Sequence, residues 1–139
     1  VAAGSTSATP VISMDFYPTF LELAGLKPGN KPIDGESLLP LFKRKGGLKR
    51  KQIFFHYPNY AWHMGNRLGS VIREGDWKLI LGNGSGGRQQ PRGKDFANTY
   101  ILSNIRKDQE ETKNHAQTEP KTASRLEKAF QKIHQNEQR

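Results

Sequence analysis

The stretch Ser70–Leu81, whose sequence is SVIREGDWKLIL, decides the fold. Two short runs rich in β-branched and large apolar residues flank the dipeptide Glu74-Gly75. Such runs are typical of strands, and a glycine between them supplies the positive φ that a tight hairpin turn needs. The stretch therefore predicts a β-hairpin, with one strand over Ser70–Arg73 and the other over Asp76–Leu81.

Segments on either side of this hairpin complete a small sheet and cover it. Gln52–Tyr57 is a dense apolar and aromatic run of strand length, and Tyr100–Ile105 is a further short strand. A C-terminal helix follows with a charged face and an apolar face, the latter formed by Ala123, Leu126, Phe130 and Ile133. The order of these strands and helices along the chain predicts an α+β fold. It consists of a small antiparallel sheet of about four strands with the C-terminal amphipathic helix packed on it.

One helix precedes the sheet, near residues 15–24. Asp15 is positioned to cap it, because a carboxylate there accepts hydrogen bonds from the unpaired N–H groups of the first turn. Phe16, Phe20 and Leu23 recur at the spacing of one helix face. The sequence therefore predicts a capped helix with one apolar stripe.

The composition limits the core that this chain builds by itself. Its 139 residues suffice for one domain, but only 34% are hydrophobic, the mean hydropathy is −0.78, and 14 Gly and 8 Pro predict many loops. Either the core is small or a neighbouring piece completes it. No apolar run is long enough to span a membrane, and the absence of Cys excludes disulfides and thiolate chemistry. The sequence begins with Val1, without an initiator Met, and its first residues show no signal-peptide pattern. We therefore expect the chain to begin inside a longer protein.

The charge is strongly positive. Lys and Arg number 22 against 13 Asp and Glu, which gives a formal net charge of +9 and a pI near 9.9. This balance favours polyanionic partners, although excess Lys also serves simply to solvate a surface. One hypothesis is therefore a small basic module that binds nucleic acid or acidic polysaccharide. Its cations would be those of Lys43–Lys51 with Arg88, Arg92 and Lys94, and its stacking surfaces would be Tyr60 and Trp62.

The residues alone supply no complete active site. The four His show no metalloprotease spacing, the carboxylates form no close pair, and no nucleophile elbow occurs. His56 is the most informative of these residues, because it ends an apolar strand and faces a loop. A structural role is the commoner outcome for such a histidine.

Three stretches, which together cover nearly the whole chain, carry a family resemblance. Pro10–Gly25 with Asp34–Leu41 is similar to the passage DxxPTLLxLAG … DGxSLLPLL of the type I sulfatases, the alkaline-phosphatase-like sulfuric ester hydrolases. Phe55–Pro58 with Val71–Ile80 resembles their hairpin WHYP … AIRxGDWKLI. Leu102–Asn114 is similar to their LYNLxxDPxExxN, although it departs from that pattern in two positions.

This resemblance implies a parent enzyme that hydrolyses sulfate esters, of sulfated glycans in particular. In such enzymes the nucleophile is a formylglycine made from Cys or Ser in a Cys/Ser-x-Pro-x-Arg motif, and Ca²⁺ stabilises charge on the sulfate oxygens. The motif does not occur in these 139 residues, and the family's calcium ligands belong to upstream segments. The resemblance therefore implies no nucleophile, metal or cofactor in this part, and no activity of the isolated chain.

The resemblance also implies an organisation and a site. Residues 1–45 would end the catalytic domain, and residues 46–139 would form the C-terminal subdomain, whose loops shape the substrate cleft. The substrate-binding candidates are His56, Tyr57, His63 and Arg73, although a structural role in the hairpin comes first for the arginine. The implied partners are the catalytic domain of the same chain and a sulfated glycan or small sulfate ester, rather than nucleic acid. The implied location is periplasmic or extracellular.

Overall fold

The computed structural model describes residues 1, 3–30, 32–57, 69–82 and 100–137, and the chain divides into two compact units, Val1–Ile53 and Phe54–Arg139. In chain order the elements are η1 (Ser13–Asp15), α1 (Phe16–Leu23), α2 (Leu39–Phe42), β1 (Gln52–Tyr57), β2 (Gly69–Glu74), β3 (Trp77–Gly82), β4 (Tyr100–Asn104) and α3 (Pro120–Glu137). None of the helices in the described ranges is long and apolar enough to cross a membrane. The predicted domain boundary between residues 45 and 46 stays a prediction.

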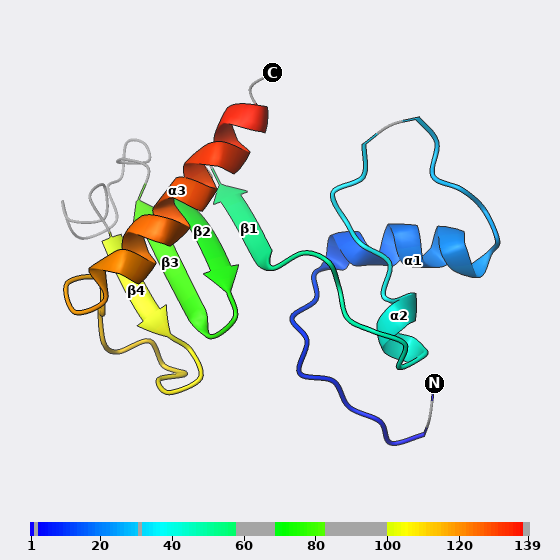
Figure 1. Cartoon of the computed structure of the whole chain (residues 1–139), viewed down its shortest axis with the longest axis horizontal. Helices are drawn as coiled ribbons and strands as arrows, with labels where there is room; N and C mark the ends of the chain where they lie inside the picture. The colour runs from blue at the N-terminus through cyan, green and yellow to red at the C-terminus, as the bar shows by residue number, and fades with distance from the viewer. Residues whose placement is uncertain (2, 31, 58–68, 83–99, 138–139) are drawn as a thin grey trace, which may run out of the picture. The chain divides into compact units, whose positions relative to one another are not determined.

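The four strands form one sheet in the order β1-β2-β3-β4, so strands that follow one another in the chain lie side by side (Figure 1). β2 and β3 are the antiparallel hairpin that the sequence predicts. Glu74 pairs with Trp77, and the two residues between them form the turn. Gly75 has a φ of 56° at the first turn position, which is the position that a type II′ turn reserves for glycine. The second strand therefore begins one residue later than predicted.

Helix α3 covers one face of this sheet (Figure 1). Ile72, Leu79 and Leu102 lie in register on three neighbouring strands, and all three are completely buried. From the helix they are met by Ala123, Leu126 and Phe130, with Ile133 half-buried farther along. Burying one such aliphatic side chain contributes roughly 1.5–3 kcal/mol. The predicted α+β fold, with the amphipathic helix packed on the sheet, is confirmed.

The segment after β4 takes the place of a further strand. The side chain of Asn114 accepts a hydrogen bond from the Leu102 N–H at 3.1 Å and donates one to the Tyr100 carbonyl at 2.9 Å. The His115 N–H donates to the Leu102 carbonyl at 2.7 Å. These bonds satisfy backbone groups along β4 that an exposed edge would leave unpaired.

A buried carboxylate organises the first unit. Asp15 is completely buried and accepts hydrogen bonds from the backbone N–H groups of Ile12 at 2.9 Å and Glu36 at 3.0 Å. Both of its oxygens also contact the Arg50 guanidinium. The helix predicted near residues 15–24 is confirmed, but the predicted cap is wrong, since no side-chain hydrogen bond caps α1. Instead of bonding to the first helical turn, the carboxylate joins the neighbouring Ile12 to two distant residues, Glu36 and Arg50.

Two further contacts hold α1 against the segment before α2. Thr19 donates through Oγ1 to the Asp15 carbonyl at 2.6 Å and accepts from the Leu38 N–H at 2.9 Å. At Gly35 an added Cβ would lie 2.0 Å from the Met14 carbonyl oxygen. Only glycine permits this close approach of two backbone segments.

The predicted apolar stripe of α1 forms, but it is not covered. Phe16 is 51% exposed, Phe20 63% and Leu23 61%, and the two phenyl rings stack on each other with centroids 6.1 Å apart. The helix turns Thr19 inward instead. Nothing in the described part of the chain therefore occupies the face that periodicity marks for burial.

Candidate functional site

His56 lies near the end of β1, at the margin of the core under α3. Its Nδ1 is 2.8 Å from the hydroxyl of Ser70, a completely buried residue of β2. The imidazole ring lies 6.1 Å from the ring of Phe54 and 6.4 Å from that of Phe130, measured between centroids. These contacts join β1, β2 and α3, which gives His56 a structural role in addition to any contact with a ligand.

Arg73 lies on β2, beside the hairpin turn. Its Nε donates a hydrogen bond to the Gly75 carbonyl at 3.3 Å, so the side chain folds back over the turn. Ile72 faces α3, and because side chains alternate along a strand, Arg73 points from the opposite face of the sheet. His56 is on the α3 side, against Phe130. The two predicted site residues therefore do not converge on one point.

The other predicted contacts lie outside the described residues. The backbone of Tyr57 ends β1, but its side chain is not described, and neither is any part of His63. The same holds for the proposed stacking residues and for the cations of the glycine-rich segment, namely Tyr60, Trp62, Arg88, Arg92 and Lys94. Their roles stay predictions.

The basic cluster Lys43–Lys51 is partly used to hold the first unit together. The N–H groups of Lys49 and Arg50 donate to the Glu36 carboxylate at 2.6 and 3.0 Å, and the Arg50 guanidinium binds Asp15. Burial alone would raise the pKa of Asp15, but the hydrogen bonds from Arg50, Glu36 and Ile12 outweigh it and lower this pKa to about 2. The cluster therefore offers a polyanion fewer cations than its sequence indicates.

The described residues do not fit a calcium ion. Among them, no three His, Cys, Asp or Glu side chains gather closely enough to hold a metal. Asp15, the completely buried carboxylate, already has its oxygens engaged by a guanidinium and two backbone amides. Calcium needs six to eight oxygen ligands, so any such site of the protein must draw on other residues.

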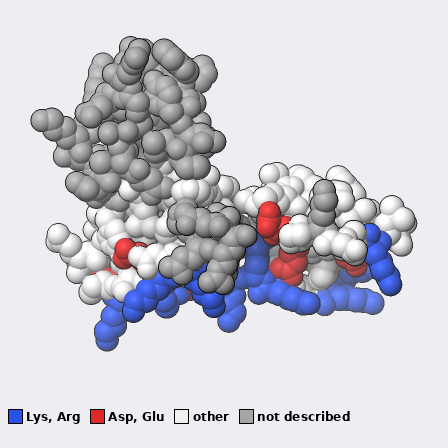
Figure 2. Space-filling view, turned by 90° about the horizontal axis from the view of Figure 1, so that it is seen from above, with Lys and Arg blue, Asp and Glu red and all other residues white. Residues whose placement is uncertain are grey.

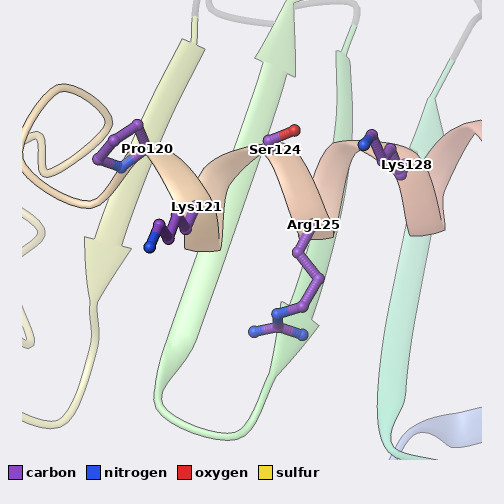
Figure 3. Close-up of a pocket in the computed structure, with 5 residues that line it drawn as sticks. All are labelled: Pro120, Lys121, Ser124, Arg125 and Lys128. Carbon is purple, nitrogen blue, oxygen red and sulfur yellow. The ribbon is translucent and has the colours of Figure 1, made fainter.

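A shallow groove runs along the outer side of α3, away from the sheet (Figure 3). It is lined by Pro120, Lys121, Ser124, Arg125 and Lys128. Arg125 forms an ion pair with Glu74 of β2. In Figure 2 the Lys and Arg side chains gather along the lower edge of the view, with fewer Asp and Glu side chains near them. The groove is thus a cationic surface with one hydroxyl donor and no aromatic lining.

Comparison with protein families identifies one family that the chain matches. The family model described as N-sulphoglucosamine sulphohydrolase, C-terminal, matches residues 1–138. The chain belongs to this family. Its match extends over both compact units, so the resemblance to the C-terminal part of sulfatases is confirmed.

Curated relatives of the family are sulfatases. The chain is 36% identical over 83 residues to N-acetylglucosamine-6-O-sulfatase of Bacteroides thetaiotaomicron, which covers 58% of this chain and 15% of the relative. It is 35% identical over 74 residues to steryl-sulfatase of Mus musculus, covering 49% of this chain and 12% of the relative. It is 29% identical over 140 residues to arylsulfatase K of Danio rerio, covering 96% of this chain and 24% of the relative. The chain thus spans less than a quarter of the length of these proteins.

Solved structures show the same relation. BT4656, solved in complex with its substrate D-Glucosamine-2-N, 6-O-disulfate, matches with a TM-score of 0.77 and 25% identity, over 97% of this chain and 26% of that one. Ps i-CgsB matches with a TM-score of 0.66 and 25% identity, over 96% of this chain and 26% of that one. The family fold therefore extends across both units of this chain.

Sequence reasoning missed the cationic groove on α3. It identified the charged face of the C-terminal helix without separating the signs of its charges. The signal was present, because Lys121, Arg125, Lys128 and Lys132 follow one another at steps of four, three and four residues. Residues at these steps share one helix face.

Proposed function

We propose that this chain is the C-terminal region of a sulfatase whose full-length protein hydrolyses sulfate esters of sulfated glycans. The observation that carries the proposal is the family match over residues 1–138. Two relatives support the substrate class, an N-acetylglucosamine-6-O-sulfatase and a protein whose substrate is a sulfated glucosamine. The chain spans about a quarter of the latter, which leaves the reaction chemistry to the rest of such a protein.

In this proposal the chain supplies structure and cleft walls. The sequence has no Cys/Ser-x-Pro-x-Arg motif from which a formylglycine nucleophile could arise. Upstream segments of the full-length protein would hold a formylglycine, whose hydrate supplies the nucleophilic hydroxyl, and calcium, which supplies stabilisation of charge on the sulfate oxygens. The end of β1, with His56 and Tyr57, and the residues that follow it, with His63, would line the cleft. Arg73 holds the hairpin turn, and a contact with sulfate is its alternative role.

The first prediction concerns sulfate release. The 139-residue chain should release no sulfate from an aryl sulfate or a sulfated glucosamine, whereas the full-length protein isolated from its source should release it from the sulfated sugar. Ion chromatography of free sulfate measures both. Turnover by the 139-residue chain, or a full-length protein that leaves every sulfated sugar intact, would contradict the proposal.

The exposed face of α1 supports a partner within the same longer protein. The face consists of the stacked rings of Phe16 and Phe20 together with Leu23. The first unit also exposes Tyr17 and Leu26, whereas its buried side chains include the polar Asp15 and Thr19. Because apolar side chains are exposed while polar ones are buried, the unit has an apolar surface that another part of a protein could cover. The proposed partner of this face is the preceding part of the catalytic domain of the full-length sulfatase, which residues 1–45 would complete.

The second prediction is self-association of the 139-residue chain through this face. Phe20→Ser should weaken the association by about seventyfold, since it removes roughly 100 Å² of exposed apolar surface worth ~25 cal/mol per Å², or about 2.5 kcal/mol. The matched control is Phe55→Ser on β1, which removes a phenyl ring that is 50% exposed in the second unit. Sedimentation velocity over a concentration series measures both variants. If the unsubstituted 139-residue chain is a monomer, or if the two substitutions have equal effects, the proposed face is wrong.

We propose that the full-length protein is located in the periplasm or outside the cell, where it would encounter sulfated polysaccharide before the polymer is degraded. The support is the family relation to glycan sulfatases. Fractionation of the source cells with an antibody to this chain tests it, and a signal confined to the cytoplasm would overturn it.

A further inference from the structure

The outer face of α3 carries a continuous stripe of four cations, Lys121, Arg125, Lys128 and Lys132. With about 100° of rotation per residue, their positions fall within an arc of roughly 60°. The buried residues Ala123, Leu126 and Phe130 occupy the opposite side. All four cations are exposed, and Figure 3 shows Lys121, Arg125 and Lys128 projecting from α3, with the Arg125 side chain extending beside the helix over the strands. We call this set the α3 cation stripe.

The α3 cation stripe is poorly neutralised by its surroundings. Arg125 pairs with Glu74, but none of the three lysines forms an ion pair with another residue of the described ranges. Glu127 of the same helix points elsewhere, and its carboxylate accepts a hydrogen bond from the Tyr100 hydroxyl at 3.0 Å. Like charges three and four residues apart repel each other and destabilise a helix. A bound polyanion would relieve this repulsion.

The dimensions of the α3 cation stripe favour a polymer. From Lys121 to Lys132 the helix rises about 16 Å, which is longer than one monosaccharide and suits several anionic groups in a row. The groove between the first three cations adds the Ser124 hydroxyl, a hydrogen-bond donor for a sulfate oxygen. The positive end of the helix dipole lies at Pro120, which is also the end of α3 where the groove begins.

The residues that line the groove favour a sulfated polysaccharide over a nucleic acid. Proteins that bind single-stranded nucleic acid stack its bases on aromatic side chains. The five residues that line this groove include no aromatic ring. A sulfated polysaccharide needs only cations and hydrogen-bond donors, and the groove has both.

We infer that the α3 cation stripe binds a chain of sulfated polysaccharide. The choice of this polyanion rests on the proposed function. The polymer lies along the outer face of α3, with its sulfate groups at the three lysines and at Arg125 and with Ser124 donating to one of them.

Binding of a fluorescently labelled heparin octasaccharide to the 139-residue chain tests this inference. The variant Lys121→Gln/Lys128→Gln/Lys132→Gln should bind about tenfold more weakly at physiological salt, because exposed ion pairs are individually weak and three are removed. Arg125 stays, since it also holds Glu74. The matched control is Lys43→Gln/Lys45→Gln/Lys51→Gln, whose three lysines are exposed in the first unit. Both variants lower the net charge from +9 by three, and the control should bind within threefold of the parent chain.

Three results would overturn the inference. The first is equal loss of affinity in the two variants, which assigns the binding to net charge. The second is equally tight binding of the desulfated octasaccharide, and the third is tighter binding of a DNA oligonucleotide of equal charge. Gln has nearly the helix propensity of Lys, so α3 should persist in the variant and gain slightly in thermal stability as repulsion is removed. Because this binding is measured without catalysis, its failure is distinct from a failure of the full-length protein to release sulfate.

Discussion

Replacing Arg50 with methionine should destabilise the first unit by about 3 kcal/mol, because it leaves the buried Asp15 carboxylate without its cation. Asp15 is completely buried, and both carboxylate oxygens contact the Arg50 guanidinium. Amide hydrogen exchange in the full 139-residue chain measures the loss, at the Glu36 and Leu38 N–H groups that bond to Asp15 and Thr19. Both amides should exchange at least a hundredfold faster, which corresponds to about 3 kcal/mol.

An exposed ion pair supplies the control for this prediction. Arg106 lies 3.7 Å from Asp76, with 79% and 48% of the two side chains exposed. Because water screens such a pair, Arg106→Met should cost less than about 0.5 kcal/mol. The double variant Asp15→Asn/Arg50→Met should recover part of the loss, since it leaves no unpaired buried charge. Unchanged exchange at Glu36 in Arg50→Met would show that the pair does not hold the unit.

The same pair predicts how the first unit responds to acid. The pKa of Asp15 is about 2 in the folded chain against 3.8 for a free side chain. A folded-state pKa below the unfolded value gives stability that is complete above pH 3.8 and is lost as the pH falls towards 2. The difference corresponds to about 2 kcal/mol. Hydrogen exchange at the Glu36 N–H, measured across this pH range, should show this loss of stability in the unsubstituted 139-residue chain. The variant Asp15→Asn should not show it.

The fold was predictable where its determinants are local. The hairpin of β2 and β3 follows from two apolar runs around Gly75, and α3 follows from the spacing of its apolar residues. The role of Asp15 was not predictable in this way. Its position before a helix is typical of a cap, whereas its main partner, Arg50, is 35 residues away and is brought near only by the fold. Periodicity alone could not tell that pair from a capping residue.

The candidate site was less predictable than the fold, for a physical reason. The stripe of Phe16, Phe20 and Leu23 correctly indicated a helix face, but a sequence pattern does not specify what covers that face, and here it is exposed. His56 and Arg73 were joined by a family resemblance, and strand alternation places them on opposite faces of the sheet. The α3 cation stripe was readable from spacing, once the signs of the charges are separated.

Leu126→Ala should destabilise the second unit by about 3 kcal/mol, because the removed methyl groups leave a cavity between α3 and the sheet. Leu126 is completely buried in the cluster that contains Ile72, Leu79 and Leu102. The matched control is Leu23→Ala on α1, the same substitution at a side chain that is 61% exposed, which should cost less than about 0.5 kcal/mol. Amide hydrogen exchange of the α3 residues measures the first change, and a loss below about 1 kcal/mol would contradict the packing of α3 on the sheet.

This prediction also links the core to the α3 cation stripe. A protein helix such as α3 owes most of its stability to packing of its apolar face, and like charges in a row weaken it further. Leu126 lies on the opposite side from Lys121, Lys128 and Lys132, so it touches no polyanion bound to them, yet it keeps the helix on the sheet. Near the melting temperature of the variant, Leu126→Ala should therefore weaken binding of the heparin octasaccharide in proportion to the fraction of undocked α3. At low temperature, where α3 remains docked, the affinity should equal that of the parent chain, because the lysines are unchanged.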